Sequence, residues 1–290
     1  MNFAPARKTQ LRAEILLFVA TALWGGAYLV TRDAVRSISP FVFVGVRFCV
    51  ASAMITLLTR PDLPSFTRRE MRGGFYVALA MVGGYTSQAF AMTSMGAGRT
   101  AFINALYVPM VPVLLIILGK PGHRPWPHWL AWVAVGVSCV GLYLMAGPGG
   151  GGFGRGEALA FGGAGAIAAE ILLVAKFAPG QDARRLAVAQ CVSVAVLCLV
   201  LAWLRGDPVF VGGWIVPAAA LGCMSAFLQV SVNWAMRAVP AGRATLIYAT
   251  EPVWAGALGV LTGERMSGRA IVGAGLILVS LVMPRNFPPK

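Results

Sequence analysis

The stretch Ala241–Val282, AGRATLIYATEPVWAGALGVLTGERMSGRAIVGAGLILVSLV, holds two apolar runs joined by the polar hinge Gly263-Glu264-Arg265. Each run has about the length needed to cross a membrane. An acid followed directly by a proline, Glu251-Pro252, lies inside the first run. A charge at that depth is costly unless it faces protein or water, and the proline removes a backbone donor beside it. The stretch therefore predicts two membrane helices with a functional site at Glu251.

An earlier stretch, residues 97–120, repeats this pattern as AGRTAFINALYVPMVPVLLIILGK. Both copies open with Ala-Gly-Arg, carry a proline near the middle and end in glycine plus a charged residue. Membrane helices resemble one another in composition, but the shared order of these three features favours duplication. We therefore expect an internal repeat.

The composition is typical of a membrane protein that crosses the bilayer many times. Of 290 residues, 58% are hydrophobic and 12% are charged, with a mean hydropathy of +0.75. In soluble domains about a quarter of the residues are charged. The net charge of +14 comes from basic residues in short loops, so it indicates orientation in the membrane and not nucleic-acid binding. The five cysteines lie in apolar runs, and His123 and His128 share one loop, so we expect neither a metal site nor a cofactor.

Ten spans fit the sequence, near residues 13–32, 40–59, 73–94, 99–119, 127–146, 156–177, 185–204, 212–236, 243–262 and 268–284. The first run has no cleavage pattern, so we interpret it as a retained span and not as a signal peptide. With the N-terminus inside, 16 Lys and Arg residues fall on the inner side and 7 on the outer side. This bias predicts a multi-pass protein with both termini in the cytoplasm.

The glycine run that begins at Gly147 divides the chain into two sets of five spans. We expect a first repeat at 1–146, a connector at 147–154 and a second repeat at 155–290. Arg12-Ala-Glu-Ile-Leu near the start of the first set resembles Arg155-Gly-Glu-Ala-Leu in the second. Because five is odd, the second set enters the membrane from the opposite side. Inverted repeats of this kind are typical of transporters, with the binding site near the midplane between the halves.

The chain resembles the drug/metabolite transporter superfamily in its ten-span form, which is built from two EamA-type repeats. The residues that carry this resemblance are Ala22-Leu-Trp-Gly-Gly, Ser39-Pro40 leading to Arg47-Phe48, Thr250-Glu-Pro-Val-Trp, Gly263-Glu264-Arg265 and the glycine-spaced last span. It covers nearly the whole chain and implies an all-α membrane protein that exports amino acids, other metabolites or drugs across the bacterial inner membrane. One branch of the superfamily relies on an acid in the middle of its first span. Glu14 lies at the very start of that span, so this role is not transferred to it.

Three charged residues fall inside predicted spans: Arg47, Glu170 and Glu251. Arg47 either extends toward the outer headgroups or faces inward to pair with an acid or a substrate carboxylate. For Glu170, pairing with Lys176 near the cytoplasmic end competes with a proton-binding role. Glu251 is the strongest candidate for a proton or substrate site, and its alternative role is a carboxylate that hydrogen-bonds neighbouring helices.

Uncharged polar and aromatic residues also lie within the spans, among them Trp24 and Tyr28 in the first. Many membrane aromatics pack in the interior or lie at the bilayer interface. Pairs spaced i and i+3 share one face of a helix, as we expect for Tyr85 with Gln88, Asn104 with Tyr107, and Tyr248 with Glu251. The substrate-binding residues that we predict are Trp24, Tyr85, Gln88, Asn104, Tyr107, Tyr248 and Glu251.

Such a cavity suits a small solute with a hydrophobic side chain and a polar or zwitterionic head. We therefore predict an exporter of small amphipathic metabolites that works by alternating access, with amino acids, aromatic ones included, ahead of drugs. The partners are the substrate and the lipid bilayer, and a monomer is favoured. A membrane-embedded transferase is the distant alternative, because the sequence has no catalytic cluster. A channel is the third class of function that the sequence leaves open.

Overall fold

The computed structural model describes residues 7–60, 65–94, 97–118, 129–146, 154–210, 212–261 and 267–283. Its helices are α1 (Arg7–Ala34), α2 (Pro40–Thr59), α3 (Arg68–Ser94), α4 (Ala97–Asn104), α5 (Tyr107–Leu118), α6 (Trp129–Ala146), α7 (Arg155–Phe177), α8 (Ala183–Leu204), α9 (Ile215–Ala235), α10 (Ala241–Tyr248), α11 (Glu251–Leu261) and α12 (Gly268–Val282). The hinge Gly263-Glu264-Arg265, His123, His128 and residues 147–153 lie outside the described residues.

These helices confirm the all-α fold with ten spans. Helix α2 coincides with the predicted span 40–59, and within the described residues six stretches are long and apolar enough to cross a membrane by length and composition. Two spans differ from the prediction because each is broken into two helices, α4 with α5 and α10 with α11. The breaks at 105–106 and 249–250 occupy the same position in the two duplicated stretches.

The helix contacts follow a two-fold exchange of the repeats, in which α1, α2, α3, α4–α5 and α6 correspond to α7, α8, α9, α10–α11 and α12. Helix α3 packs against α7 just as α9 packs against α1, and α3 packs against α8 as α9 does against α2. The pairs α2–α8 and α6–α12 are each made of corresponding helices. Helix α5 contacts α10, and α11 contacts α4 in the same way.

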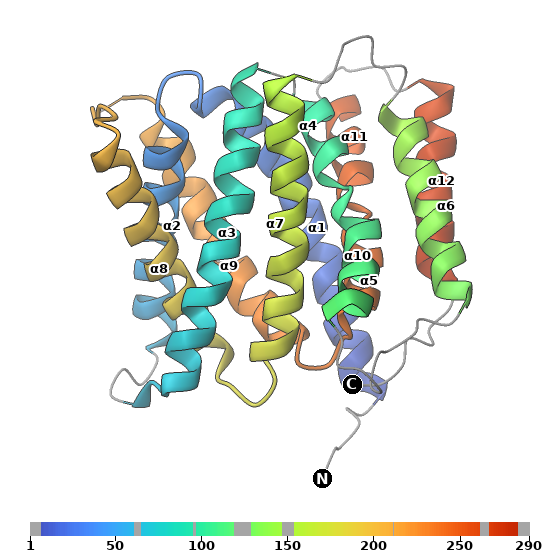
Figure 1. The fold of residues 1–290 in the computed structure, drawn as a ribbon, viewed down its shortest axis with the longest axis horizontal. Coiled ribbons are helices and arrows are strands. Elements are labelled where there is room, and N and C mark those ends of the chain that lie inside the picture. The colour runs from blue at the N-terminus through green and yellow to red at the C-terminus, as the bar shows by residue number, and fades with distance from the viewer. Residues whose placement is uncertain are drawn as a thin grey trace.

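The two repeats are inverted, since α1 and α7 run in opposite directions in Figure 1. We call the face at which α1 begins the N-terminal face. Helices α2 and α8 lie together at one end of the molecule, and α6 and α12 lie at the other (Figure 1). The broken spans lie between these ends, beside α1 and α7.

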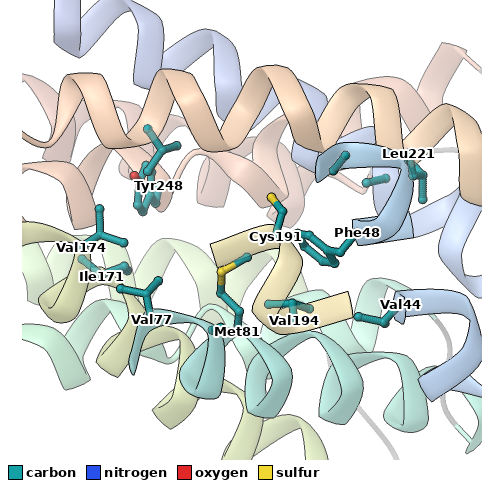
Figure 2. Close-up of a cluster of buried hydrophobic side chains, with 14 of the residues drawn as sticks. Val44, Phe48, Val77, Met81, Ile171, Val174, Cys191, Val194, Leu221 and Tyr248 are labelled. Carbon is teal, nitrogen blue, oxygen red and sulfur yellow. The ribbon is translucent and has the colours of Figure 1, made fainter. Parts of the chain in front are cut away.

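The outer surface of the helices is apolar, as a lipid-facing surface requires. On α8 the exposed side chains include Val192, Val196 and Val200, while Val194 and Cys198 are buried. The buried cluster in Figure 2 joins α2, α3, α7, α8 and α9 through Phe48, Met81 and their neighbours. Small residues let these helices approach closely. A β-carbon at Gly74 of α3 would lie 2.5 Å from the Ala189 β-carbon of α8.

Glu70 ties the two repeats together at the N-terminal face. Its carboxylate accepts hydrogen bonds from the Thr67 backbone (2.8 Å), the Asp182 backbone (3.2 Å) and Arg185 Nε (3.0 Å). Burial raises the pKa of Glu70, but these hydrogen bonds outweigh burial and hold the pKa below its ordinary value. A hydrogen bond from the Arg184 side chain likewise lowers the pKa of Asp182 to about 2. The carboxylates of Glu70 and Asp182 are therefore ionised at neutral pH.

The opposite face carries a corresponding tie at the start of α2. Ser39 Oγ donates to Asp207 Oδ2 at 2.5 Å, and Arg205 Nε lies 3.6 Å from Asp207 Oδ1. The Arg205 guanidinium also lies over the rings of Phe41 and Phe90. The turn after α8 is thus fixed to α2 at this face, as the turn after α2 is fixed to α8 at the other.

The inverted fold predicts that cysteines introduced at Arg69 and Val209 react from opposite sides of the membrane. Arg69 lies at the start of α3 on the N-terminal face, and Val209 lies exposed in the turn after α8. We expect a membrane-impermeant maleimide to label one of them in intact cells and the other only after permeabilisation, on a background without the native cysteines. Labelling of both from the same side would contradict the ten-span inverted fold.

Candidate functional site

A cavity lies between the two repeats, with about 750 Å³ of unfilled space that includes its open part. The first repeat contributes α1, α2, α3 and α5, and the second contributes α7, α9, α10 and α11. The polar and aromatic lining residues are Trp24, Tyr28, Thr31, Arg47, Tyr85, Gln88, Tyr107, Glu170, Tyr248 and Glu251.

Both helix breaks lie at the cavity, and each is followed by a proline. Pro252 is the second residue of α11, and Pro109 is the third residue of α5. A proline has no backbone N–H to bond the carbonyl one turn earlier, so the helix opens there. The predicted i, i+3 pairs of Asn104 with Tyr107 and of Tyr248 with Glu251 fall at these breaks, and Tyr248 and Glu251 nevertheless line the same cavity. Each pair lies across a break and not on one continuous helix.

Glu251 begins α11 and is held by two phenols from the other repeat. The phenols of Tyr28 of α1 and Tyr107 of α5 interact with its carboxylate, and all three side chains line the cavity. Asn104 lies behind this pair, and its Nδ2 is 3.5 Å from the Tyr28 hydroxyl. A negative charge at the first turn of a helix is also favoured by the helix dipole. Glu251 therefore links three helices at the centre of the molecule.

Helix α1 approaches α11 closely enough to position this carboxylate. A β-carbon at Gly25 would lie 2.8 Å from the Ala255 nitrogen and 3.0 Å from the Glu251 carbonyl oxygen. The hydroxyls of Thr21 and Thr250 are 2.9 Å apart and buried, and this contact fastens the break to α1. Only a residue without a side chain permits this approach at position 25.

Arg47 faces inward, so its alternative placement at the outer headgroups is wrong. Its side chain lines the cavity, and the residue is 4% exposed. Arg47 Nε donates to Ser225 Oγ on α9 at 2.8 Å. Its guanidinium carbon lies 5.2 Å from the centre of the Tyr85 ring and 5.5 Å from that of Phe48. Aromatic faces attract a cation but leave its charge unneutralised.

Glu170 also lines the cavity, from α7. It forms no ion pair with Lys176, whose ammonium lies 5.4 Å from the centre of the Phe177 ring, so the predicted pairing is wrong. Residues six apart on a helix point in different directions, which separates the two side chains. Glu170 and Arg47 thus line one cavity from α7 and α2.

The structure brings the predicted site residues together, with one exception. Trp24, Tyr85, Gln88 and Tyr107 line the cavity along with Tyr248 and the three charged residues. Asn104 does not line it but is fully buried behind Tyr28. Tyr28 and Thr31 were missed as site residues, although their spacing of four and seven from Trp24 places all three on one face of α1.

Two tyrosines of the cavity differ in whether their hydroxyls have hydrogen-bond partners. Replacing each by phenylalanine should therefore affect the free energy of unfolding differently. Among the described residues, the buried Tyr248 hydroxyl has no hydrogen-bond partner. We expect Tyr248→Phe to leave the free energy of unfolding unchanged or slightly raised. Tyr28→Phe removes a donor from Glu251 and should lower it by about 1–3 kcal/mol. Thermal unfolding in detergent measures both, and equal losses would contradict this assignment.

Comparisons with known proteins agree with this architecture. The model of the EamA-like transporter family matches residues 11–147 and 154–284, one match in each repeat. A protein of Archaeoglobus fulgidus named as an uncharacterized transporter is 24% identical over 286 residues, which cover 94% of this chain and 86% of that protein. A crystal structure with 19% sequence identity superposes with a TM-score of 0.74 and covers 93% of this chain and 95% of that chain. At this identity the superposition supports the fold alone.

Proposed function

The chain belongs to the EamA-like transporter family, within the drug/metabolite transporter superfamily, and we propose that it exports small amphipathic metabolites, amino acids ahead of drugs. One observation carries the proposal. The cavity between the repeats combines aromatic rings with charges of both signs, Arg47 against Glu170 and Glu251. A solute with a hydrophobic side chain and a zwitterionic head matches this lining. Phosphorylated sugars and nucleotides match it poorly, because a single arginine faces two acids.

Alternating access is the mechanism that the inverted repeats support. The tie of Glu70 joins the start of α3 to the start of α8 at one face, and the tie of Asp207 joins α2 to the turn after α8 at the other, so this end of the molecule serves as a scaffold. The movement then falls on α1, α7 and the two broken spans, which surround the cavity. The breaks supply backbone that changes direction without unwinding a continuous helix.

We further propose that the protein lies in a bacterial inner membrane with its N-terminal face in the cytoplasm. The excess of Lys and Arg on that side supports this orientation. In the labelling experiment, a cysteine at Val209 then reacts from outside intact cells, and one at Arg69 reacts only after permeabilisation. The reverse result would place the N-terminal face outside.

Counterflow in proteoliposomes tests the substrate class. We expect saturable counterflow with hydrophobic or aromatic members of a panel of twenty amino acids, and weaker counterflow with common cationic drugs. Saturation separates a transporter from a channel. Counterflow with the drugs alone would overturn the amino-acid assignment and favour a multidrug exporter of the same superfamily.

Glu251→Gln tests whether the central carboxylate binds a proton or the substrate amine. We expect the variant to fold, because glutamine keeps the shape and the hydrogen bonding, but to abolish or uncouple transport. Wild-type transport should respond to an imposed pH gradient, and the variant should not. The tie of Glu70 and Asp182 stays ionised near neutral pH, so it does not produce such a response.

Two results would leave Glu251 structural. One is a wild-type protein that is indifferent to the gradient, together with a Glu251→Gln variant that transports normally. The other is a loss of stability in Glu251→Ala without a matching loss of transport in Glu251→Gln. In that case the substrate's own gradient drives export.

A further inference from the structure

We propose that Arg47 binds the carboxylate of the substrate and so selects for acids and zwitterions, an inference that rests on the proposed function. Arg47 is 4% exposed and lines the cavity. Buried charges are normally paired, because burying an unpaired charge is costly. Among the described residues Arg47 forms no ion pair, and its one hydrogen bond runs from Nε to Ser225. The substrate supplies the missing anion.

The free edge of the guanidinium fits a carboxylate. Because Nε is engaged by Ser225, the two terminal Nη groups remain for the ligand. Two parallel N–H donors match the two oxygens of a carboxylate, which a lysine ammonium cannot do in the same plane. The rings of Tyr85 and Phe48 lie near the guanidinium and limit its orientations.

The second repeat fixes Arg47 in place before any ligand binds. Ser225 Oγ accepts from Arg47 Nε and donates to the Leu221 carbonyl at 2.7 Å. A β-carbon at Gly222 would lie 2.7 Å from the Arg47 carbonyl oxygen, so α9 lies directly against the backbone of α2. A donor that is held in position by packing loses little entropy on binding.

The acids of the cavity complete a zwitterion site. The charges that act on Arg47 include Glu170, which reaches the cavity from α7 and is not ion-paired with it. Glu251 lies on α11 and is held by Tyr28 and Tyr107. The cation is thus on α2 and the acids are on helices of the other repeat. A molecule with a carboxylate toward α2 and an ammonium toward α7 is neutralised at both ends.

Binding of three matched compounds to the purified protein tests this inference. The compounds are phenylalanine, phenethylamine, which lacks the carboxylate, and 3-phenylpropionate, which lacks the amine. We expect Arg47→Gln to weaken binding of phenylalanine and 3-phenylpropionate by about 10- to 100-fold, the loss expected for a hydrogen bond to a charged group. Binding of phenethylamine should change less than about twofold, since its ammonium does not contact Arg47.

Arg205→Gln is the matched control. Arg205 also lies over two aromatic rings but is outside the cavity lining, so its loss should leave all three affinities unchanged. Arg47→Lys keeps the charge without the planar fork and should show a smaller loss, confined to the two carboxylates. If Arg47→Gln does not fold, the comparison of the two carboxylates with the amine in Arg47→Lys decides whether Arg47 binds the carboxylate.

The outcomes separate the inference from the proposed function. Equal losses for amine and carboxylates, or a wild-type protein that does not bind 3-phenylpropionate, would overturn the role of Arg47. Amino-acid counterflow that persists in Arg47→Gln at the wild-type rate would also overturn it, and the exporter function would stand. If 3-phenylpropionate binding depends on Arg47 but no amino acid shows counterflow, the carboxylate site stands and the amino-acid function falls.

Discussion

The structure depends on one constraint, which is that backbone without hydrogen-bond partners is tolerated in a membrane only where protein or water surrounds it. At the breaks 105–106 and 249–250, within two spans, the chain leaves regular helical geometry and forms shortened bonds such as that from the Thr250 N–H to the Ile247 carbonyl. Ala105 of the first break and both residues of the second are buried, and the Thr250 hydroxyl fastens the second break to Thr21 of α1. The chain therefore has to close around its two breaks, and the cavity lies where they meet.

The breaks also place the charges. Glu251 begins the second half of one broken span, and Tyr107 begins the second half of the other. Because the repeats are related by a two-fold exchange, these corresponding residues meet at the cavity, where the phenol interacts with the carboxylate. An acid that would be costly in lipid is thus satisfied by the partner repeat. Arg47 depends on the same interface, through Ser225 of α9.

Close packing by small residues holds this arrangement without a large polar network. Gly25 admits α1 to the backbone of α11, and Gly222 admits α9 to the backbone of α2. Both contacts join one repeat to the other beside a charged residue of the cavity. Polar ties lie at the two membrane faces, where Glu70 joins α3 to α8 and Asp207 joins the turn after α8 to α2. The centre remains free for a solute.

The sequence by itself determined the spans, the duplication and the depth of each charge, because hydropathy, prolines and charge positions are local properties of the chain. Helix α2 ends where its apolar run ends. Pro109 and Pro252 each lie just after one of the two helix breaks. Only the tertiary structure decided which partner each side chain meets. Tyr28 bonds Glu251, Asn104 lies behind the cavity and Glu170 faces away from Lys176, because those contacts depend on how helices from the two repeats pack. The i, i+3 spacing presumes a continuous helix, and only the structure showed that two of the predicted pairs lie across a break.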